Sequence, residues 1–150
     1  MPAITTRRAT LADLEAVVPL FDAYRGFYGQ ASDPGRARDW LRERMQRDES
    51  VVLVAECEGA VVGFTQLYPM YSSVRTARTW ILNDLFVAES ARRSGAARAL
   101  LDAAAEFARE QGAGGISLET TRDNGPARAL YRKAGWSEDA TQWYSMSLAN

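Results

Sequence analysis

The sequence predicts a mixed α/β (α+β) fold, in which a sheet carries helices on its faces. Three observations lead to this prediction. Hydrophobic residues change several times between helical and strand spacing along the chain. Two neighbouring apolar runs are separated only by Glu58-Gly59, as in an antiparallel hairpin. The 150 residues, 47% of them hydrophobic, can bury one core, so we expect a single domain over residues 1–150.

The chain opens with a predicted edge strand and a helix. Residues 3–8 are short and rich in β-branched side chains, as edge strands often are. Thr10 and Asp13 stand in the positions of a capping box, ahead of apolar residues at helical spacing that continue to Tyr28. Pro19 lies inside this helix and should kink or split it, because proline removes a backbone donor.

A second helix and the hairpin follow. Asp33 and Pro34 are a cap and a first-turn proline, and they predict a helix that reaches about residue 47. Residues 50–57 and 60–70 are then apolar, β-branched runs, which predict two antiparallel strands.

The rest of the chain alternates strands and helices. Residues 78–87 are too continuously apolar for a solvent-facing strand, so we expect a strand inside the sheet. Helical spacing returns over residues 95–111 and 126–134, and glycine follows each helix. Residues 116–120 predict a buried strand, and residues 142–148 alternate as a last strand.

Missing residue types exclude much chemistry. There is no histidine, Cys57 is the one cysteine, and every basic residue except Lys133 is an arginine. Ser-His-Asp and Cys-His nucleophilic machinery therefore cannot be built, and neither can His-ligated or multi-cysteine zinc sites. We expect no metal, and proton transfer must use carboxylates, tyrosine, backbone or water.

The net charge of -1 offers no argument for nucleic acid or a membrane surface as a partner. Residues 1–10 are polar, and no apolar run approaches the roughly 20 residues of a membrane span. A cytoplasmic protein is the expectation.

Two segments carry the chemistry. In the first, the strand ending at Val87 is followed by a polar turn that leads into a helix, and glycine at a helix start lets an anion approach unpaired N–H groups. A phosphate or pyrophosphate fits such a turn, although a plain turn with solvated arginines is an alternative. The residues of the turn are Arg92, Arg93, Ser94, Gly95, Ala96, Ala97 and Arg98.

The second segment reads NGPARALYRKAGW over residues 124–136. Asn124 caps a short helix, Gly135 ends it, and Tyr131 lies on its apolar side. From composition alone, a tyrosine such as Tyr131 is more often a core aromatic residue whose hydroxyl has a hydrogen-bond partner.

Together these segments resemble the GNAT superfamily of acetyl-CoA-dependent N-acetyltransferases. Residues 92–97 match its acyl-CoA loop, (Q/R)-x-x-G-x-(G/A), and residues 124–136 match its N-x-x-A-x-x-L-Y-x-x-x-G-(F/W) segment. The resemblance implies a mostly antiparallel sheet that splays at its middle strands. It also implies acetyl-CoA as co-substrate and direct attack by a primary amine in a ternary complex.

The resemblance further assigns roles to residues. Backbone N–H groups of residues 93–98 would hold the pyrophosphate, and the main chain of Leu85, Phe86 and Val87 would pair with the pantetheine arm. Asn124 would contact the arm from the other side. Tyr131 would protonate the leaving thiolate, and a backbone N–H near Phe86 would stabilise the oxyanion.

Two carboxylates compete as the base that takes the proton of the amine. Asp84 lies in LNDLFV, which resembles L-E-D-F-F-V of the diamine acetyltransferases, with Asn83 in place of their glutamate. Glu119 lies in LET, which resembles the L-E-V of ribosomal-protein and protein N-terminal acetyltransferases. Strand alternation puts Trp80, Leu82, Asp84 and Phe86 on one face, so without a bulge Asn83 and Asp84 cannot both face a substrate. A structural ion pair is the alternative for each acid.

The acceptor side is less specified. Tyr24, Tyr28 and Asp84 would suit an amine cation, although ordinary packing of the two tyrosines is an alternative. The acceptor can be a small-molecule amine or a protein amine. Other functions for the same fold are a non-catalytic acyl-CoA sensor and a protein-interaction domain, and residues 142–148 could pair two copies into a homodimer.

Overall fold

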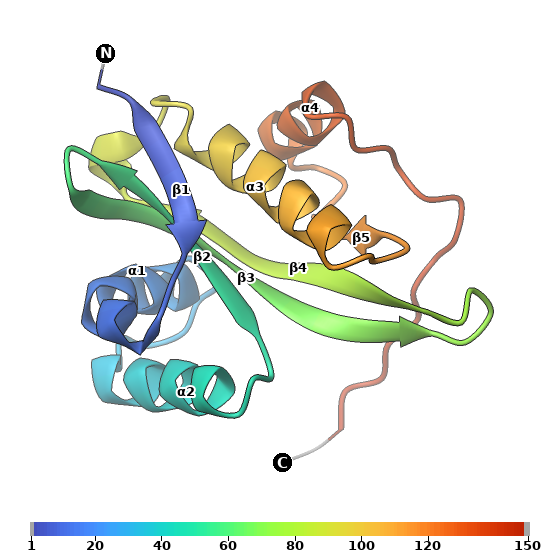
Figure 1. The fold of residues 1–150 in the computed structure, drawn as a ribbon, viewed down its shortest axis with the longest axis horizontal. Coiled ribbons are helices and arrows are strands. Elements are labelled where there is room, and N and C mark those ends of the chain that lie inside the picture. The colour runs from blue at the N-terminus through green and yellow to red at the C-terminus, as the bar shows by residue number, and fades with distance from the viewer. Residues whose placement is uncertain (1, 149–150) are drawn as a thin grey trace. The chain divides into compact units, whose positions relative to one another are not determined.

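The apolar runs of the sequence form a five-stranded sheet in the computed structural model, which describes residues 2–148 (Figure 1). The strand order follows the chain, and only the last pair is parallel. The strands are β1 (Ile4–Arg8), β2 (Val51–Cys57), β3 (Ala60–Ser72), β4 (Ala77–Val87) and β5 (Ile116–Ser117).

The chain divides into two units, one ending at Glu119 and the other beginning at Thr120. The first unit holds the sheet and the helices α1 (Leu14–Phe27), α2 (Pro34–Gln46) and α3 (Ala96–Glu110). The second unit holds α4 (Gly125–Lys133). None of the helices in the described part of the chain is long and apolar enough to span a membrane.

Helices cover both faces of the sheet, as predicted. Phe64 of β3 meets Phe21 of α1 edge to face, with ring centroids 6.1 Å apart. Its neighbour Gly63 faces the other way, where an added Cβ would lie 3.3 Å from Leu100 of α3. Because successive strand residues point to opposite faces, α1 and α3 lie on opposite sides of the sheet.

A β-bulge in β4 changes which residues share a face. Gln66 is opposite Asp84, but the next residue of β3 is opposite Leu82, so Asn83 is an extra residue in β4. Before the bulge, Trp80 packs on Phe107 of α3, with ring centroids 5.2 Å apart. After the bulge, the side chains of Asp84 and Phe86 lie on the α1 face, both close to Tyr24. The expectation that Trp80, Leu82, Asp84 and Phe86 share one face is therefore wrong.

Three further expectations on elements are corrected. The helix α1 is not split at Pro19 but continues through it, with only the one backbone bond to Glu15 removed, and a kink there stays a prediction. The strand predicted over residues 116–120 is limited to Ile116–Ser117. Residues 142–148 form no strand and their apolar side chains are exposed, since alternation supplies a pattern but no partner backbone. The homodimer expected through this segment stays a prediction.

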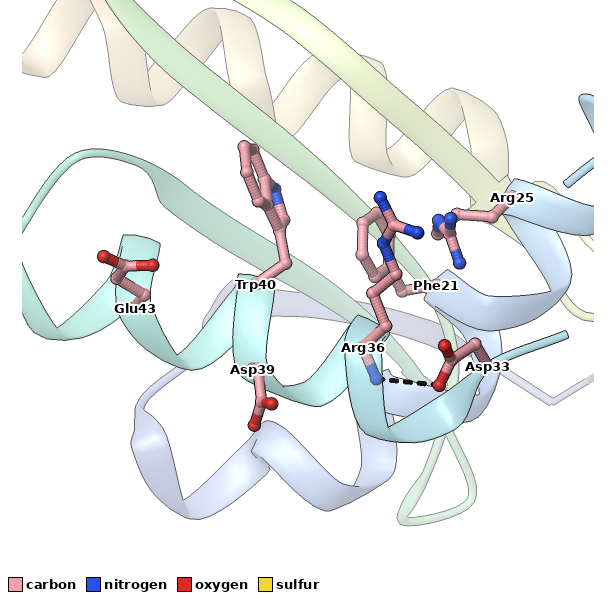
Figure 2. A pocket seen from close by; sticks show the side chains of 7 residues that line it. All are labelled: Phe21, Arg25, Asp33, Arg36, Asp39, Trp40 and Glu43. Atoms are coloured by element: carbon pink, nitrogen blue, oxygen red, sulfur yellow. Dashed lines mark hydrogen bonds between the residues drawn. The ribbon is translucent and has the colours of Figure 1, made fainter. Parts of the chain in front are cut away.

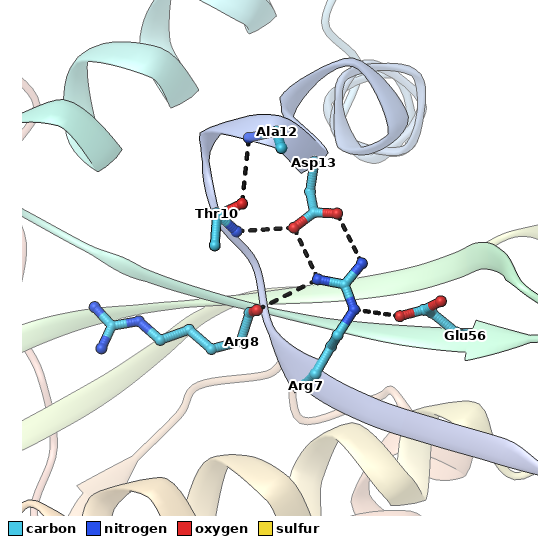
Figure 3. A network of polar contacts seen from close by, with 6 residues as sticks. All are labelled: Arg7, Arg8, Thr10, Ala12, Asp13 and Glu56. Atoms are coloured by element: carbon cyan, nitrogen blue, oxygen red, sulfur yellow. Dashed lines mark hydrogen bonds and ion pairs between the residues drawn. The ribbon is translucent and has the colours of Figure 1, made fainter.

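The start of α1 is joined to the sheet by an ion-pair network (Figure 3). The Arg7 guanidinium on β1 donates to both carboxylate oxygens of Asp13, at 2.7 and 2.8 Å, and also pairs with Glu56. Asp13 in turn accepts from the Thr10 backbone N–H at 2.8 Å and completes the predicted capping box. Arg7 and the Thr10 N–H lower the pKa of Asp13 to about 2.

We expect Asp13→Asn to lower the Tm at neutral pH, because the amide loses the charge that Arg7 binds. The folded-state pKa is depressed, so this stabilisation is present above the unfolded pKa and disappears as pH falls through about 2. Thermal melts between about pH 7 and pH 2 should therefore show the two proteins converge at low pH. Glu106→Gln, which breaks an exposed pair with Arg109, is the control. A difference in Tm that persists unchanged at low pH contradicts the prediction.

Candidate functional site

Five residues singled out in the sequence line one cavity of the first unit, which we call the tyrosine cavity. They are Tyr24, Tyr28, Asn83, Asp84 and Glu119. The cavity has a volume of about 360 Å³, and Tyr68 of β3 also lines it. Aromatic rings and carboxyl groups both attract ammonium ions, so the cavity is suited to an amine.

The bulge in β4 is the reason that Asn83 and Asp84 both line this cavity. Tyr24 Oη donates a hydrogen bond to the carbonyl oxygen of Asn83 at 3.1 Å, which holds the bulged residue against α1. The Tyr24 ring also packs on Phe86, with centroids 6.4 Å apart. Burial and the nearby charge of Asp84 raise the pKa of Tyr24, so its hydroxyl stays protonated and serves as a donor.

Asp84 is a buried carboxyl group and is only 3% exposed. One oxygen accepts from Asn83 Nδ2 at 2.9 Å, and the other accepts from Gln66 Nε2. Burial raises the pKa of Asp84, and these hydrogen bonds offset the effect only in part. No arginine or lysine forms an ion pair with Asp84 within residues 2–148. A buried acid in a cavity without a cationic partner is typical of a functional group.

Gln66 is a site residue that the sequence analysis missed. It is fully buried on β3, where its amide nitrogen reaches Asp84 and its oxygen Oε1 has no hydrogen-bond partner in the described chain. The signal was available, because Gln66 is a polar residue inside the apolar run 60–70. Glu119, by contrast, is exposed.

The turn before α3 has the backbone of an anion site. Arg93 and Gly95 both have positive φ angles, 66° and 89°, and an added Cβ at Gly95 would meet nothing within 4 Å. Ser94 Oγ accepts from the Ala96 N–H at 3.3 Å, whereas the N–H groups of Arg93, Gly95, Ala97 and Arg98 have no partner among the described residues. Such N–H groups at a helix start, beside several arginines, fit a phosphate or pyrophosphate.

Arginines of this turn are held in different ways. Arg92 Nε donates to the Val87 carbonyl at 3.3 Å, and its guanidinium stacks over Phe86 at 5.5 Å. Arg98 pairs with Asp102 one helical turn further on, at 3.1 Å.

The sheet leaves part of β4 without a neighbour. β5 pairs with β4 only at Trp80 and Ile81 in the described chain, so no strand pairs with residues 85–87 on that side, although the Val87 carbonyl accepts a hydrogen bond from Arg92 Nε. The backbone of Leu85, Phe86 and Val87 can therefore bind an extended ligand arm there, as a further strand would.

The second unit contains the other two predicted residues. Asn124 caps α4 by accepting from the Ala127 N–H at 3.2 Å, which confirms the predicted cap. Tyr131 lies on α4, and Gly135, with a φ of 94°, follows the helix. No cluster of acidic or cysteine side chains in the described chain could hold a metal ion.

The comparisons with known proteins agree on one family. Residues 15–136 match the acetyltransferase (GNAT) family. An uncharacterized N-acetyltransferase of Bacillus subtilis (strain 168) is 48% identical over 133 residues, which are 89% of each chain. A crystal structure of a probable acetyltransferase has a TM-score of 0.93 and 40% identity, and the match covers 97% of this chain and 99% of that one.

A structure of an aminoglycoside N-acetyltransferase in complex with CoA shares the fold, with a TM-score of 0.83 and 17% identity over 99% of this chain and 97% of that one. The predicted sheet with helices on both faces, the acyl-CoA loop residues and the family match all lead to the same assignment. The chain is an enzyme of the GNAT family of N-acetyltransferases.

Proposed function

We propose that the protein transfers an acetyl group from acetyl-CoA to a primary amine by direct attack in a ternary complex. The observation that carries this proposal is the tyrosine cavity, in which the buried carboxyl of Asp84 lies without a cationic partner in the described chain. The turn at Gly95 also supports the proposal, because its N–H groups can bind the pyrophosphate of acetyl-CoA, the other substrate. When bound, acetyl-CoA supplies the acetyl group as a thioester.

In this proposal, the N–H groups of residues 93–98 bind the pyrophosphate and the unpaired edge of β4 binds the pantetheine arm. Leu85, Phe86 and Val87 provide that edge, and an N–H near Phe86 stabilises the oxyanion. Asn124 contacts the arm as well. Tyr131 donates a proton to the departing thiolate.

We propose Asp84 as the base that accepts the proton of the attacking amine. A raised pKa makes a carboxylate a better proton acceptor at neutral pH than an ordinary surface acid. Asn83 holds one oxygen of Asp84 in place rather than acting as a base. Glu119, which is exposed at the same cavity, then adds negative charge that attracts the cationic amine.

Acetyl-CoA binding is the first test. At a ligand concentration of about 100 times Kd, acetyl-CoA or CoA should stabilise the protein by about 2.7 kcal/mol, which raises the Tm by about 5–10 °C. NADH, which shares the adenine and pyrophosphate but lacks the pantetheine arm, should give no comparable shift. Absence of any shift with millimolar acetyl-CoA would contradict the proposal.

We expect Tyr131→Phe to lower kcat by about 10- to 1000-fold, because the thiolate would leave without its proton donor. The Tm shift produced by acetyl-CoA should stay nearly that of the wild type, since the substitution removes only the hydroxyl oxygen. Turnover is measured as free thiol released with an amine. Unchanged turnover would reject the role of Tyr131.

The remaining expectations stay predictions. They concern the cytoplasmic location, the single domain over residues 1–150 and the homodimer. A sensor without catalysis would be protected by CoA but would release no thiol with any amine. An interaction domain would capture a partner and show no protection by CoA.

A further inference from the structure

A second cavity, which we call the arginine cavity, adjoins the tyrosine cavity and has a volume of about 640 Å³. Phe21, Arg25 and Trp40 line both cavities, and Arg36 of α2 lines only the second (Figure 2). A ligand that enters one cavity therefore reaches residues of the other.

Arg25 has hydrogen-bonding capacity that the protein does not use. Its Nη1 atom is shut off from solvent and has no hydrogen-bond partner in the described chain. Neither Arg25 nor Arg36 takes part in an ion pair within residues 2–148. The charge of Arg25 helps to lower the pKa of Asp22, but both oxygens of that acid are occupied by Ser32 Oγ and the Asp33 N–H. A buried N–H group without a partner is costly unless a ligand supplies an acceptor.

The side chains of Arg25 and Arg36 line the same cavity. Arg25 comes from α1 and Arg36 from α2, and Figure 2 shows their side chains pointing toward one another in front of Phe21. Like charges in such a position repel each other, and an anion between them removes the repulsion.

The acids of the arginine cavity already have partners. Asp33 caps α2 by accepting a backbone N–H of that helix at 3.1 Å. Asp39 pairs with Arg42 at 3.6 Å, and Glu43 pairs with Arg44 at 3.0 Å. Within residues 2–148, Asp33 is then the one acid of the cavity without an ion pair, against the two arginines, so the unpaired charge in this cavity is net positive.

We propose that the acceptor is an amine that also carries a carboxylate, as an amino acid does. Arg25 and Arg36 bind the carboxylate, and the amine lies in the tyrosine cavity beside Asp84. This inference rests on the proposed acetyl transfer and specifies its substrate class. Arginine forks bind carboxylates through paired, charge-assisted hydrogen bonds, whereas a diamine would place its second cation against the two arginines.

The test compares amines in pairs that differ by one carboxylate, such as lysine with cadaverine and ornithine with putrescine. Thiol release gives kcat/KM for each. In the wild type, the carboxylate-bearing member of at least one pair should exceed its partner by about tenfold or more. Arg25→Gln and Arg36→Gln should each reduce this preference by raising KM for the amino acid, with kcat and the plain amine little changed. Arg36→Lys should restore part of it.

Arg38→Gln is the matched control, because it removes an arginine of α2 that already pairs with Glu15, and neither Arg38 nor Glu15 lines either cavity. It should leave the preference as in the wild type. Arg36 is exposed, so its variants test the inference even where Arg25→Gln does not fold. Equal kcat/KM within every pair, or variants that slow both members alike, would overturn the inference.

Binding separates this inference from the proposed function. Thermal melts with CoA and each amine report binding without turnover. Protection by the amino acids that is lost in Arg36→Gln supports the carboxylate site, even if no thiol is released. Protection without thiol release would contradict the proposed acetyl transfer but not the carboxylate site. If plain amines are acetylated and no amino acid protects the protein, the acetyl transfer stands and the carboxylate site is rejected.

Discussion

Asp84→Asn should lower kcat/KM by about 100- to 10,000-fold at neutral pH, the usual contribution of a general base. The amide fills the same space but cannot accept the proton of the ammonium. As pH rises toward about 10, the amine loses its proton without help, so the variant should approach the wild type. The wild-type rate should fall as pH drops through the raised pKa of Asp84, because the base must be ionised.

The same substitution should stabilise the protein. The folded-state pKa of Asp84 is raised, so its contribution favours folding below the unfolded pKa and is lost as pH rises through the raised value. At neutral pH the wild type thus holds a buried charge that Asp84→Asn removes. A gain of about 1 kcal/mol, or about 2–4 °C in Tm, is expected, and it should shrink in acid.

Glu119→Gln is the matched control for both effects, because it removes the same charge from the exposed side of the same cavity. It should leave the Tm unchanged and lower kcat/KM less than Asp84→Asn does. If Glu119→Gln instead causes the loss at neutral pH with recovery at high pH, the base is Glu119. If neither variant does so, water alone accepts the proton.

Gly95→Glu should reduce the Tm shift that acetyl-CoA produces from about 5–10 °C to below about 1 °C. The substitution places a carboxylate at the N-terminus of α3, where it competes with the pyrophosphate for the unpaired N–H groups. The side chain meets no protein atom near its Cβ, so the loss should come from the ligand's site rather than from a clash.

Two further variants separate charge from backbone strain. Gly95→Ala has the strain of a positive φ without the charge, and it should keep much of the shift. Gly112→Glu adds the same charge at another glycine of positive φ, 71°, at the opposite end of α3. That end is about 22 Å away along the helix, so the shift should remain. A full shift in Gly95→Glu would contradict the assignment of this turn to the pyrophosphate.

Several parts of the fold follow from local sequence because their causes are local. The capping box at Thr10 and Asp13 needs residues three positions apart, and the cap at Asp33 needs only its own helix. The hairpin at Glu58-Gly59 likewise follows from two residues that adopt positive φ. Each was predicted and confirmed.

Other parts depend on partners that are distant in the chain. The alternation of β4 could not reveal the bulge at Asn83, because the bulge is defined by pairing with β3. The same limit explains the strand that residues 142–148 do not form. Period-2 alternation is a property of one segment, whereas a strand requires hydrogen bonds to another.

For the site, the chemical types were accessible from sequence and their grouping was not. The resemblance of residues 92–97 and 124–136 to the GNAT motifs implied acetyl transfer, Asp84 and Glu119 were the candidate bases, and the absence of histidine was compatible with that chemistry. The role of Gln66 and the placement of Arg25 and Arg36 in one cavity required the structure. These residues come from β3, α1 and α2, and burial and electrostatic contact across elements arise only when the elements pack against one another.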